Sequence, residues 1–92
     1  MRIKKGTLVF CICTRKVCDI VNGESYTCEG VRSGFMFDWH GNISEIDFGV
    51  NIGIKNLYND DIFTSRKEAL EELKRRLYYR IDRINVELAN LN

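Results

Sequence analysis

The strongest constraint in this sequence is an apolar stripe in its C-terminal third, because the spacing of the stripe requires one long helix. Leucine or isoleucine recurs every three or four residues from position 70 to position 91, which is the spacing of side chains on one face of an α-helix. At 100° per residue these positions span roughly 80°. The stripe consists of Leu70, Leu73, Leu77, Ile81, Ile84, Leu88 and Leu91. We therefore predict a single helix over residues 65–90, on the order of 37 Å long.

The predicted helix has a clear starting signal at residues 65–68. Ser65 and Glu68 form a capping box, in which the serine hydroxyl accepts a hydrogen bond from the backbone N–H of Glu68 and the glutamate bonds back to Ser65. Acidic residues follow in the first turns and arginines come later, which is the order that the helix dipole favours. Two ion pairs with i,i+4 spacing are expected on the helix surface: Glu71–Arg75 and Glu72–Arg76.

The residues before the helix have the pattern of short strands separated by turns. All seven glycines lie within the first 53 residues, and proline is absent. A strand is predicted over residues 7–14. Asn22-Gly23 predicts a two-residue hairpin turn, because a type I′ turn needs positive φ at both positions, and this turn would pair residues 16–21 with 24–31. A second hairpin is predicted around residues 40–42, and a last strand over residues 50–57 with a bulge or bend at Gly53.

Alternation in the second hairpin gives an expectation for its faces. Phe35, Phe37 and Trp39 would share one face of the strand, and Met36 and Asp38 would lie on the other. Trp39 is expected to lie in the core.

About five short strands in a chain of 92 residues do not easily remain a flat sheet with open edges. We predict an α+β fold: a small, strongly bent antiparallel sheet or SH3-like partial barrel, followed by one long C-terminal α-helix. Residues 1–92 would form a single domain, β-rich over 1–60 and helical over 65–90. We expect the first part of the helix, up to Leu77, to cover the sheet.

The sheet is too small to bury the whole stripe, since a strand of five or six residues is only about 17–20 Å long. Either the last turns of the helix pack against another chain, or they cover the sheet obliquely. We favour the first and expect a homodimer. The candidates for self-association are Ile81, Ile84, Leu88 and Leu91.

A basic flank beside the stripe is the second feature of the helix. Residues 74–83 carry five positive charges and one negative charge. This flank could be solvated helix surface, a protein interface, or a set of phosphate contacts. Tyr79 lies opposite the stripe, and a tyrosine among arginines is typical of protein interfaces. The candidates for binding a partner are Arg76, Tyr79, Arg80 and Arg83. Nucleic-acid binding is the alternative prediction, although a net charge of +1 gives no general attraction to nucleic acid.

No motif in the sequence indicates an enzyme. It has no phosphate-binding glycine loop, no G-x-S-x-G and no H-E-x-x-H. We therefore expect no catalytic residue, no cofactor and no metal site. The four cysteines, Cys11, Cys13, Cys18 and Cys28, lack the paired C-x2-C spacing of common zinc sites, so buried free thiols are favoured over zinc binding or a redox role. His40 is not expected to complete a ligand set with them.

The sequence also gives an expectation for location. No run of about 18 apolar residues is present, so no transmembrane helix is predicted. The apolar N-terminal run is short and ends in Thr14-Arg15-Lys16, which favours a first strand over a signal peptide. We expect a cytoplasmic protein without membrane contact.

The stretch NDDIFTSRKEALEEL at residues 59–73 resembles a pattern found in small β-barrel proteins of phages and prophages. The pattern is an acidic turn, an apolar-Phe pair at Ile62-Phe63, a Ser or Thr cap at Ser65, and Glu-Ala before a leucine-bearing helix. The resemblance covers the last third of the chain, while the strands match only in pattern. Most such proteins are uncharacterised, and some inhibit host defence systems, as anti-CRISPR proteins do. The resemblance implies a non-enzymatic accessory protein that acts in the host cell by occluding a host protein.

Overall fold

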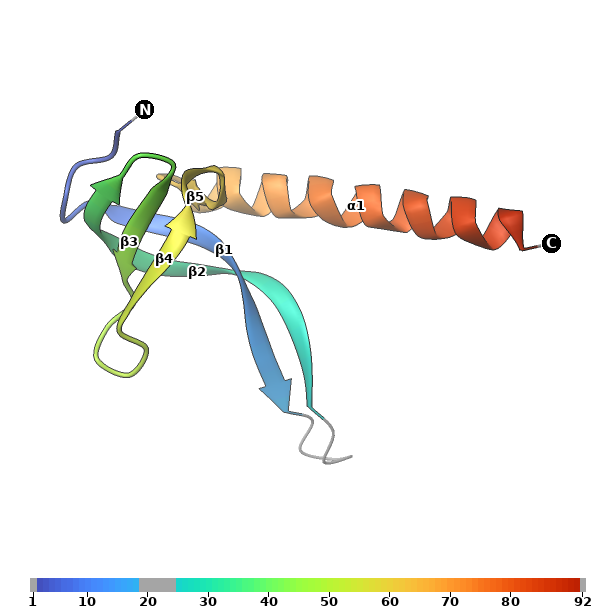
Figure 1. The fold of residues 1–92 in the computed structure, drawn as a ribbon, viewed down its shortest axis with the longest axis horizontal. Helices are drawn as coiled ribbons and strands as arrows, with labels where there is room; N and C mark the ends of the chain where they lie inside the picture. Colours follow the sequence, from blue (N-terminus) through green and yellow to red (C-terminus); the bar gives the residue numbers. More distant parts are fainter. Residues whose placement is uncertain (1, 19–24, 92) are drawn as a thin grey trace.

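A computed structural model describes residues 2–18 and 25–91, and the side chains of residues 2–14 and 29–91. It has five antiparallel strands and one long C-terminal helix, which confirms the predicted α+β fold (Figure 1). The elements are β1 (Leu8–Cys18), β2 (Ser25–His40), β3 (Ile43–Asp47), β4 (Ile54–Tyr58), the 3-10 helix η1 (Asn59–Asp61), β5 (Ile62–Phe63) and α1 (Arg66–Asn90). Within the described residues, no helix combines the length and the apolar character needed to cross a membrane.

The strand order forces the sheet to curl. The order is β4-β3-β2-β1-β5, so β4 and β5 form the two edges. In a flat sheet these edges would lie roughly 19 Å apart, since neighbouring strands are about 4.8 Å apart. Only the three residues of η1 connect them, and the chain from Tyr58 to Ile62 reaches at most about 14 Å. The sheet is therefore strongly bent, as predicted.

The first hairpin is longer than predicted. β1 and β2 pair without interruption from Leu8↔Phe35 to Cys18↔Ser25, so β1 joins two strands that we expected to be separate. A two-residue turn at Asn22-Gly23 would place Cys18 opposite Thr27, and the predicted register is therefore wrong by two residues. Residues 19–24, which include the predicted turn, lie outside the described residues. A strand register is strongly specified where one face is buried, as at Val9 and Cys11 at the start of this ladder, and here it prevails over the local turn signal.

A β-bulge changes which residues of β2 face inward. The β2–β3 register shifts between Met36 and Asp38. Met36 pairs with buried Ile46 before the shift, and Trp39 pairs with buried Ser44 after it. The prediction that Trp39 shares a face with Phe35 is therefore wrong, because the extra residue of the bulge reverses the alternation.

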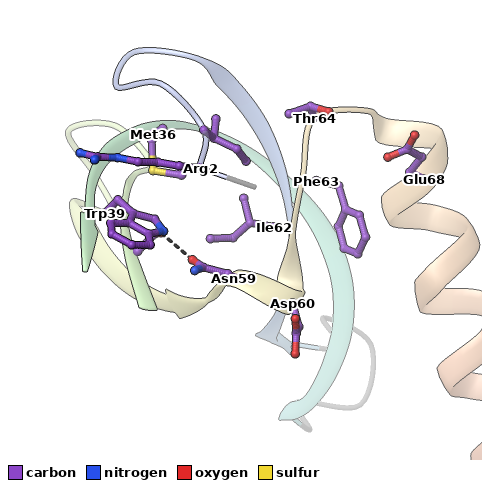
Figure 2. Close-up of a pocket in the computed structure, with 11 residues that line it drawn as sticks. Arg2, Met36, Trp39, Asn59, Asp60, Ile62, Phe63, Thr64 and Glu68 are labelled. Atoms are coloured by element: carbon purple, nitrogen blue, oxygen red, sulfur yellow. Dashed lines mark hydrogen bonds between the residues drawn. The ribbon is translucent and has the colours of Figure 1, made fainter. Parts of the chain in front are cut away.

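Trp39 lies at the open end of the curled sheet and not in the core. Its side chain is 38% exposed. It lines a cavity of about 370 Å³ together with Met36 and Ile62 (Figure 2). The guanidinium of Arg2 lies 5.1 Å from the centroid of the Trp39 ring, which is within the range of a cation–π contact.

The core lies inside the curl of the sheet. It consists of Val9, Cys11, Met36, Ile46 and Ile62. Gly34 allows β2 and β3 to approach closely at this point, because a Cβ atom there would lie 2.8 Å from the Ile46 side chain. The predicted thiol burial is confirmed for Cys11, while Cys13 is half-buried. The side chains of Cys18 and Cys28 lie outside the described residues.

The connection between β3 and β4 is a turn where a strand was predicted from Val50. Gly49 and Gly53 have φ values of 97° and 82°, which glycine adopts without strain. The Phe48 N–H donates to the carbonyl of Gly53 at 3.0 Å. Gly53 thus forms the predicted bend, and β4 begins only at Ile54.

Candidate functional site on the C-terminal helix

The helix begins as the sequence predicts. The Ser65 hydroxyl accepts a hydrogen bond from the backbone N–H of Glu68 at 3.4 Å, while the return bond from Glu68 to Ser65 is not formed among the described residues. Before the cap, Ile62 of β5 is buried and the ring of Phe63 points toward α1 (Figure 2). The short strand β5 pairs with β1 and so holds the start of α1 against the sheet.

Only the first turns of α1 rest on the sheet. Ala69 and Leu73 are its buried residues, and the helix contacts β1, β2 and β5. From Leu77 onward every described residue of the helix is exposed. Figure 1 shows α1 extending away from the sheet, and the molecule is 52 Å long as a result. We call the part of the helix from Leu77 to Asn90 the arm.

The apolar stripe points beside the sheet rather than at it. Leu73 is its one buried member, and the other six are 42% to 82% exposed. The expectation that α1 covers the sheet up to Leu77 is therefore wrong for Leu70 and Leu77. At 100° per residue, the sheet-facing residues Ala69, Leu73 and Arg76 centre roughly 70° from the middle of the stripe. The helix is rotated so that one edge of the stripe contacts the sheet, and the remainder stays in solvent.

This uncovered face forms a shallow apolar groove of about 320 Å³ along the helix. It is lined by Leu70, Leu73, Lys74, Leu77, Tyr78 and Ile81. The stem of Lys74 contributes to the lining, and its ammonium lies 5.7 Å from the centroid of the Tyr78 ring. Past Ile81 the same face continues through the self-association candidates Ile84, Leu88 and Leu91, which are all exposed. A continuous exposed apolar face of this kind marks an interaction surface.

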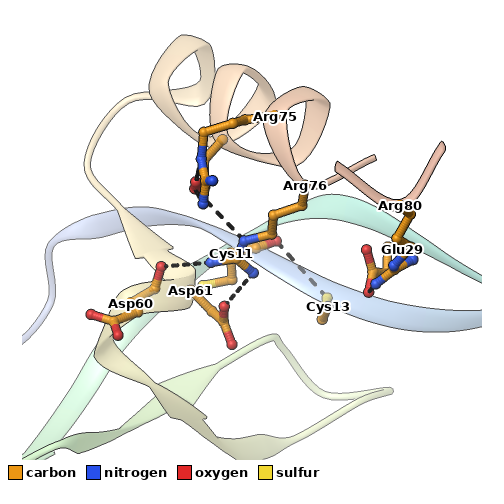
Figure 3. Close-up of polar contacts among 9 residues, drawn as sticks. Cys11, Cys13, Glu29, Asp60, Asp61, Arg75, Arg76 and Arg80 are labelled. Carbon is orange, nitrogen blue, oxygen red and sulfur yellow. Dashed lines mark hydrogen bonds and ion pairs between the residues drawn. The ribbon is translucent and has the colours of Figure 1, made fainter. Parts of the chain in front are cut away.

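Two of the four predicted partner-binding residues are turned toward the sheet. Arg76 donates to the carboxylate of Asp61 at 2.6 Å and to the backbone carbonyl of Asp60 at 3.2 Å (Figure 3). Arg80 pairs with Glu29 of β2 (Figure 3). These charge-assisted bonds fasten α1 to η1 and to the first hairpin. Arg76 and Arg80 of the basic flank therefore hold the helix on the rest of the chain.

The ion pairs along the helix surface differ in part from the prediction. Glu72 lies 3.7 Å from Arg76, which confirms that i,i+4 pair. The predicted Glu71–Arg75 pair is wrong, because Arg75 binds Glu72 at 2.5 Å with i,i+3 spacing. The hydrogen bond from Arg75 lowers the pKa of Glu72 below its usual value. Both spacings bring side chains together on a helix, so the sequence alone does not decide between them.

The other two partner-binding candidates lie on the exposed arm. Tyr79 is 60% exposed, and Arg83 forms no ion pair within the described part of the chain. Together with Val86 and two acidic residues they line a second shallow groove of about 320 Å³ on α1. The arm thus presents two surfaces, the apolar stripe and the mixed Tyr79–Arg83 surface.

A cavity beneath α1 with a partly charged lining was not predicted. Its volume is about 460 Å³, and its lining includes Arg32, Lys55 and the ion-paired residues Glu29 and Arg76. One carboxylate oxygen of Glu29 is buried there without a hydrogen-bond partner among the described residues. No local pattern could reveal this site, because Glu29 and Arg80 are 51 positions apart in the sequence.

A cluster on the β2–β3 hairpin has the donor set of a cation site. His40 Nε2 lies 2.5 Å from a Glu45 oxygen and 3.5 Å from an Asp38 oxygen. Ligand atoms of the three residues lie within 4.8 Å of one another, so they could hold a divalent cation. The signal in the sequence was the D-x-H spacing, which places both side chains on one strand face opposite Glu45. Asp38 and His40 are exposed, and the imidazole of His40 is already hydrogen bonded to the carboxylate of Glu45.

Cys11 offers no reactive thiol to the site. Burial is the main cause that raises its pKa to about 12, and the nearby Cys13 and Asp61 add to this increase. A thiol with such a pKa stays protonated at neutral pH and is a poor nucleophile and metal ligand.

Comparison with known proteins gives this chain no relative. No protein-family model, no curated protein and no solved structure matches it. Its function is therefore argued from the geometry of its own residues, and the resemblance at residues 59–73 stays a prediction.

Proposed function

We propose that this protein is a non-enzymatic binding protein that contacts other proteins through its helical arm. The observation that supports this proposal is the exposed stripe. Six leucine and isoleucine side chains remain between 42% and 82% exposed on one helix face. Full burial of such a side chain contributes roughly 1.5–3 kcal/mol, so covering all six would stabilise a complex by several kcal/mol. The sheet beside the helix leaves these six side chains uncovered, so their burial does not stabilise the single chain.

The two surfaces of the arm suit two kinds of contact. The stripe is purely aliphatic and suits the packing of another helix. The Tyr79–Arg83 surface combines an exposed aromatic ring with a cation, which is the composition of an interface that recognises a folded protein. From the resemblance at residues 59–73, we propose that the recognised protein belongs to a host cell and that the chain is a phage-encoded inhibitor of a host defence system.

Nucleic-acid binding by the basic flank receives less support. Among the described residues, Arg75 pairs with Glu72, Arg76 with Asp61 and Arg80 with Glu29. Three of the five positive side chains in residues 74–83 are therefore compensated within the chain. A phosphate-binding surface relies on cations that can replace counterions, and few remain here.

Affinity purification of the tagged protein from its native cells tests the proposal. We expect a host protein to co-purify with the wild type and with Arg75→Gln, and to be lost with Tyr79→Glu/Arg83→Glu. All three chains should give the same circular dichroism spectrum, since the changed residues are exposed. If the double variant retains the same proteins, or if no protein exceeds the background, the proposed function is wrong. Salt-sensitive binding of the wild type to duplex DNA would instead favour the alternative.

A further inference from the structure

We infer that the occupant of the apolar stripe is a second copy of this chain, packed antiparallel across a two-fold axis at Ile84. This inference rests on the proposed function, because it assigns one partner to a surface proposed there as a protein contact. It also adds an arrangement, in which the two arms overlap and the two sheets lie at opposite ends of the dimer.

The stripe is nearly symmetric about Ile84. Leu77 lies seven residues before it and Leu91 seven residues after it, while Ile81 lies three before and Leu88 four after. In an antiparallel pair with two-fold symmetry, a residue before the axis faces one at the same distance after it in the other chain. Ile84 would then meet itself, Ile81 would meet Leu88, and Leu77 would meet Leu91. Each side chain of the stripe from Leu77 to Leu91 thereby gains an apolar counterpart.

The spacing of the stripe also suits the packing of two helices. From Leu77 to Leu91 it advances fourteen positions in four steps, an average of about 3.5 residues, which is the period of a coiled coil. On a straight α-helix such a stripe drifts by roughly 20° per seven residues, so the two arms would wrap around each other with a slight left-handed supercoil. This wrapping keeps the two stripes in contact along the overlap from Leu77 to Leu91, a length of about 21 Å.

Charge complementarity selects the antiparallel arrangement over the parallel one. Arg80 and Glu87 lie on the same flank of the stripe, seven residues apart. In an antiparallel pair like flanks face each other, so Arg80 of each chain would face Glu87 of the other, twice per dimer. In a parallel pair, the flank that carries Arg80 would face the opposite flank of the other helix. Arg80 would then face Asn85, which is neutral. Arg80 can serve both Glu29 and the second chain, because a guanidinium carries five donors.

Sedimentation velocity of the full chain over a range of concentrations tests this inference. The wild type should pass from a 10.7 kDa monomer to a dimer as concentration rises. Ile81→Glu and Leu88→Lys should each weaken association by roughly 100-fold or more, because each leaves two unpaired charges in the contact. An equimolar mixture of the two variants should dimerise again, because only the antiparallel register places the new glutamate opposite the new lysine.

The control is Tyr79→Glu, on the other side of the same helix, which should dimerise like the wild type. A wild type that stays monomeric at all concentrations overturns the inference, as does a mixture that remains monomeric while the wild type dimerises. A monomer that still captures a host protein through Tyr79 and Arg83 leaves the proposed function standing. A dimer that captures no host protein supports the inference and contradicts the proposed function. The two failures are therefore distinguishable.

Discussion

The buried thiol of Cys11 makes the stability of the folded chain depend on pH. Its thiol is fully buried in the curl of the sheet, and this burial raises its pKa from about 9 to about 12. The folded chain therefore keeps the proton at pH values where the unfolded chain has lost it. The resulting stabilisation is complete below pH 9 and is lost as the pH rises toward 12.

We expect wild-type stability to fall above pH 9 by up to about 1.4 kcal/mol per pH unit from this thiol. Cys11→Val removes the titrating group and keeps a small apolar side chain in its place. Urea unfolding of both chains at pH 8, 9 and 10 under reducing conditions measures the difference. The valine variant should lack this part of the loss, whereas equal slopes for the two chains would show that the Cys11 thiol ionises in the native state as readily as in the unfolded chain.

At the residue scale, the sequence predicts the burial of Cys11 but not the position of Trp39. The sequence predicts a buried Cys11, because Cys11 and Cys13 share one face of a strand and small apolar side chains fit a tight core there, and Cys11 is buried. Trp39 was placed on the wrong face, because a bulge between Met36 and Asp38 has no composition signal strong enough to be recognised. The close approach at Gly34 depends on a residue of the next strand, so its need for glycine becomes visible only in the folded sheet.

At the scale of elements, Arg76 fastens the helix to the sheet. Its side chain is 29% exposed and bonds with Asp61, whose side chain is 25% exposed. Arg75 is its neighbour on the same helix, but its side chain is 70% exposed and pairs only within α1. Partial burial strengthens the first pair and solvent screens the second.

We expect Arg76→Gln to lower the free energy of unfolding by roughly 1.5–3 kcal/mol, the range for a lost bond to a charged group. The matched control Arg75→Gln should stay within about 0.5 kcal/mol of the wild type. Chemical denaturation followed by the fluorescence of Trp39 compares the three chains. Similar losses for both variants would mean that the contact with Asp61 contributes nothing beyond ordinary helix surface charge.

The elements themselves were largely predictable. The Ser65 cap and the helical period give α1 its boundaries, because both depend on residues close in the sequence. The rotation of α1 on the sheet was not predictable, since it follows from Arg76 reaching Asp61 and Arg80 reaching Glu29, which are 15 and 51 positions away. This rotation is what leaves Leu70 and Leu77 uncovered, so the apolar surface of the candidate site is larger than the sequence indicates.

The whole molecule divides into a folded head and a helical arm. The head comprises the curled sheet, η1 and the start of α1, and among the described side chains its last ion pair with the helix is that of Arg80 with Glu29. Beyond this pair the described residues of α1 are exposed on all sides. An isolated helix of this length is marginal in water unless its apolar face is packed. The arm should therefore depend on the dimer, while the head should not depend on the arm.

A chain that ends at Asp82 tests this division. It keeps Arg76 and Arg80 and removes all of the stripe beyond Ile81, so we expect it to unfold cooperatively at a denaturant midpoint close to that of the dilute full chain. Its sedimentation should not change with concentration, since the contact around Ile84 is gone. A chain that ends at Lys74 is the control, because it also lacks both arginine contacts and should be clearly less stable. If the chain ending at Asp82 loses the near-ultraviolet signal of Trp39, the arm is needed to fold the sheet, and the chain is then one cooperative unit to its last turn.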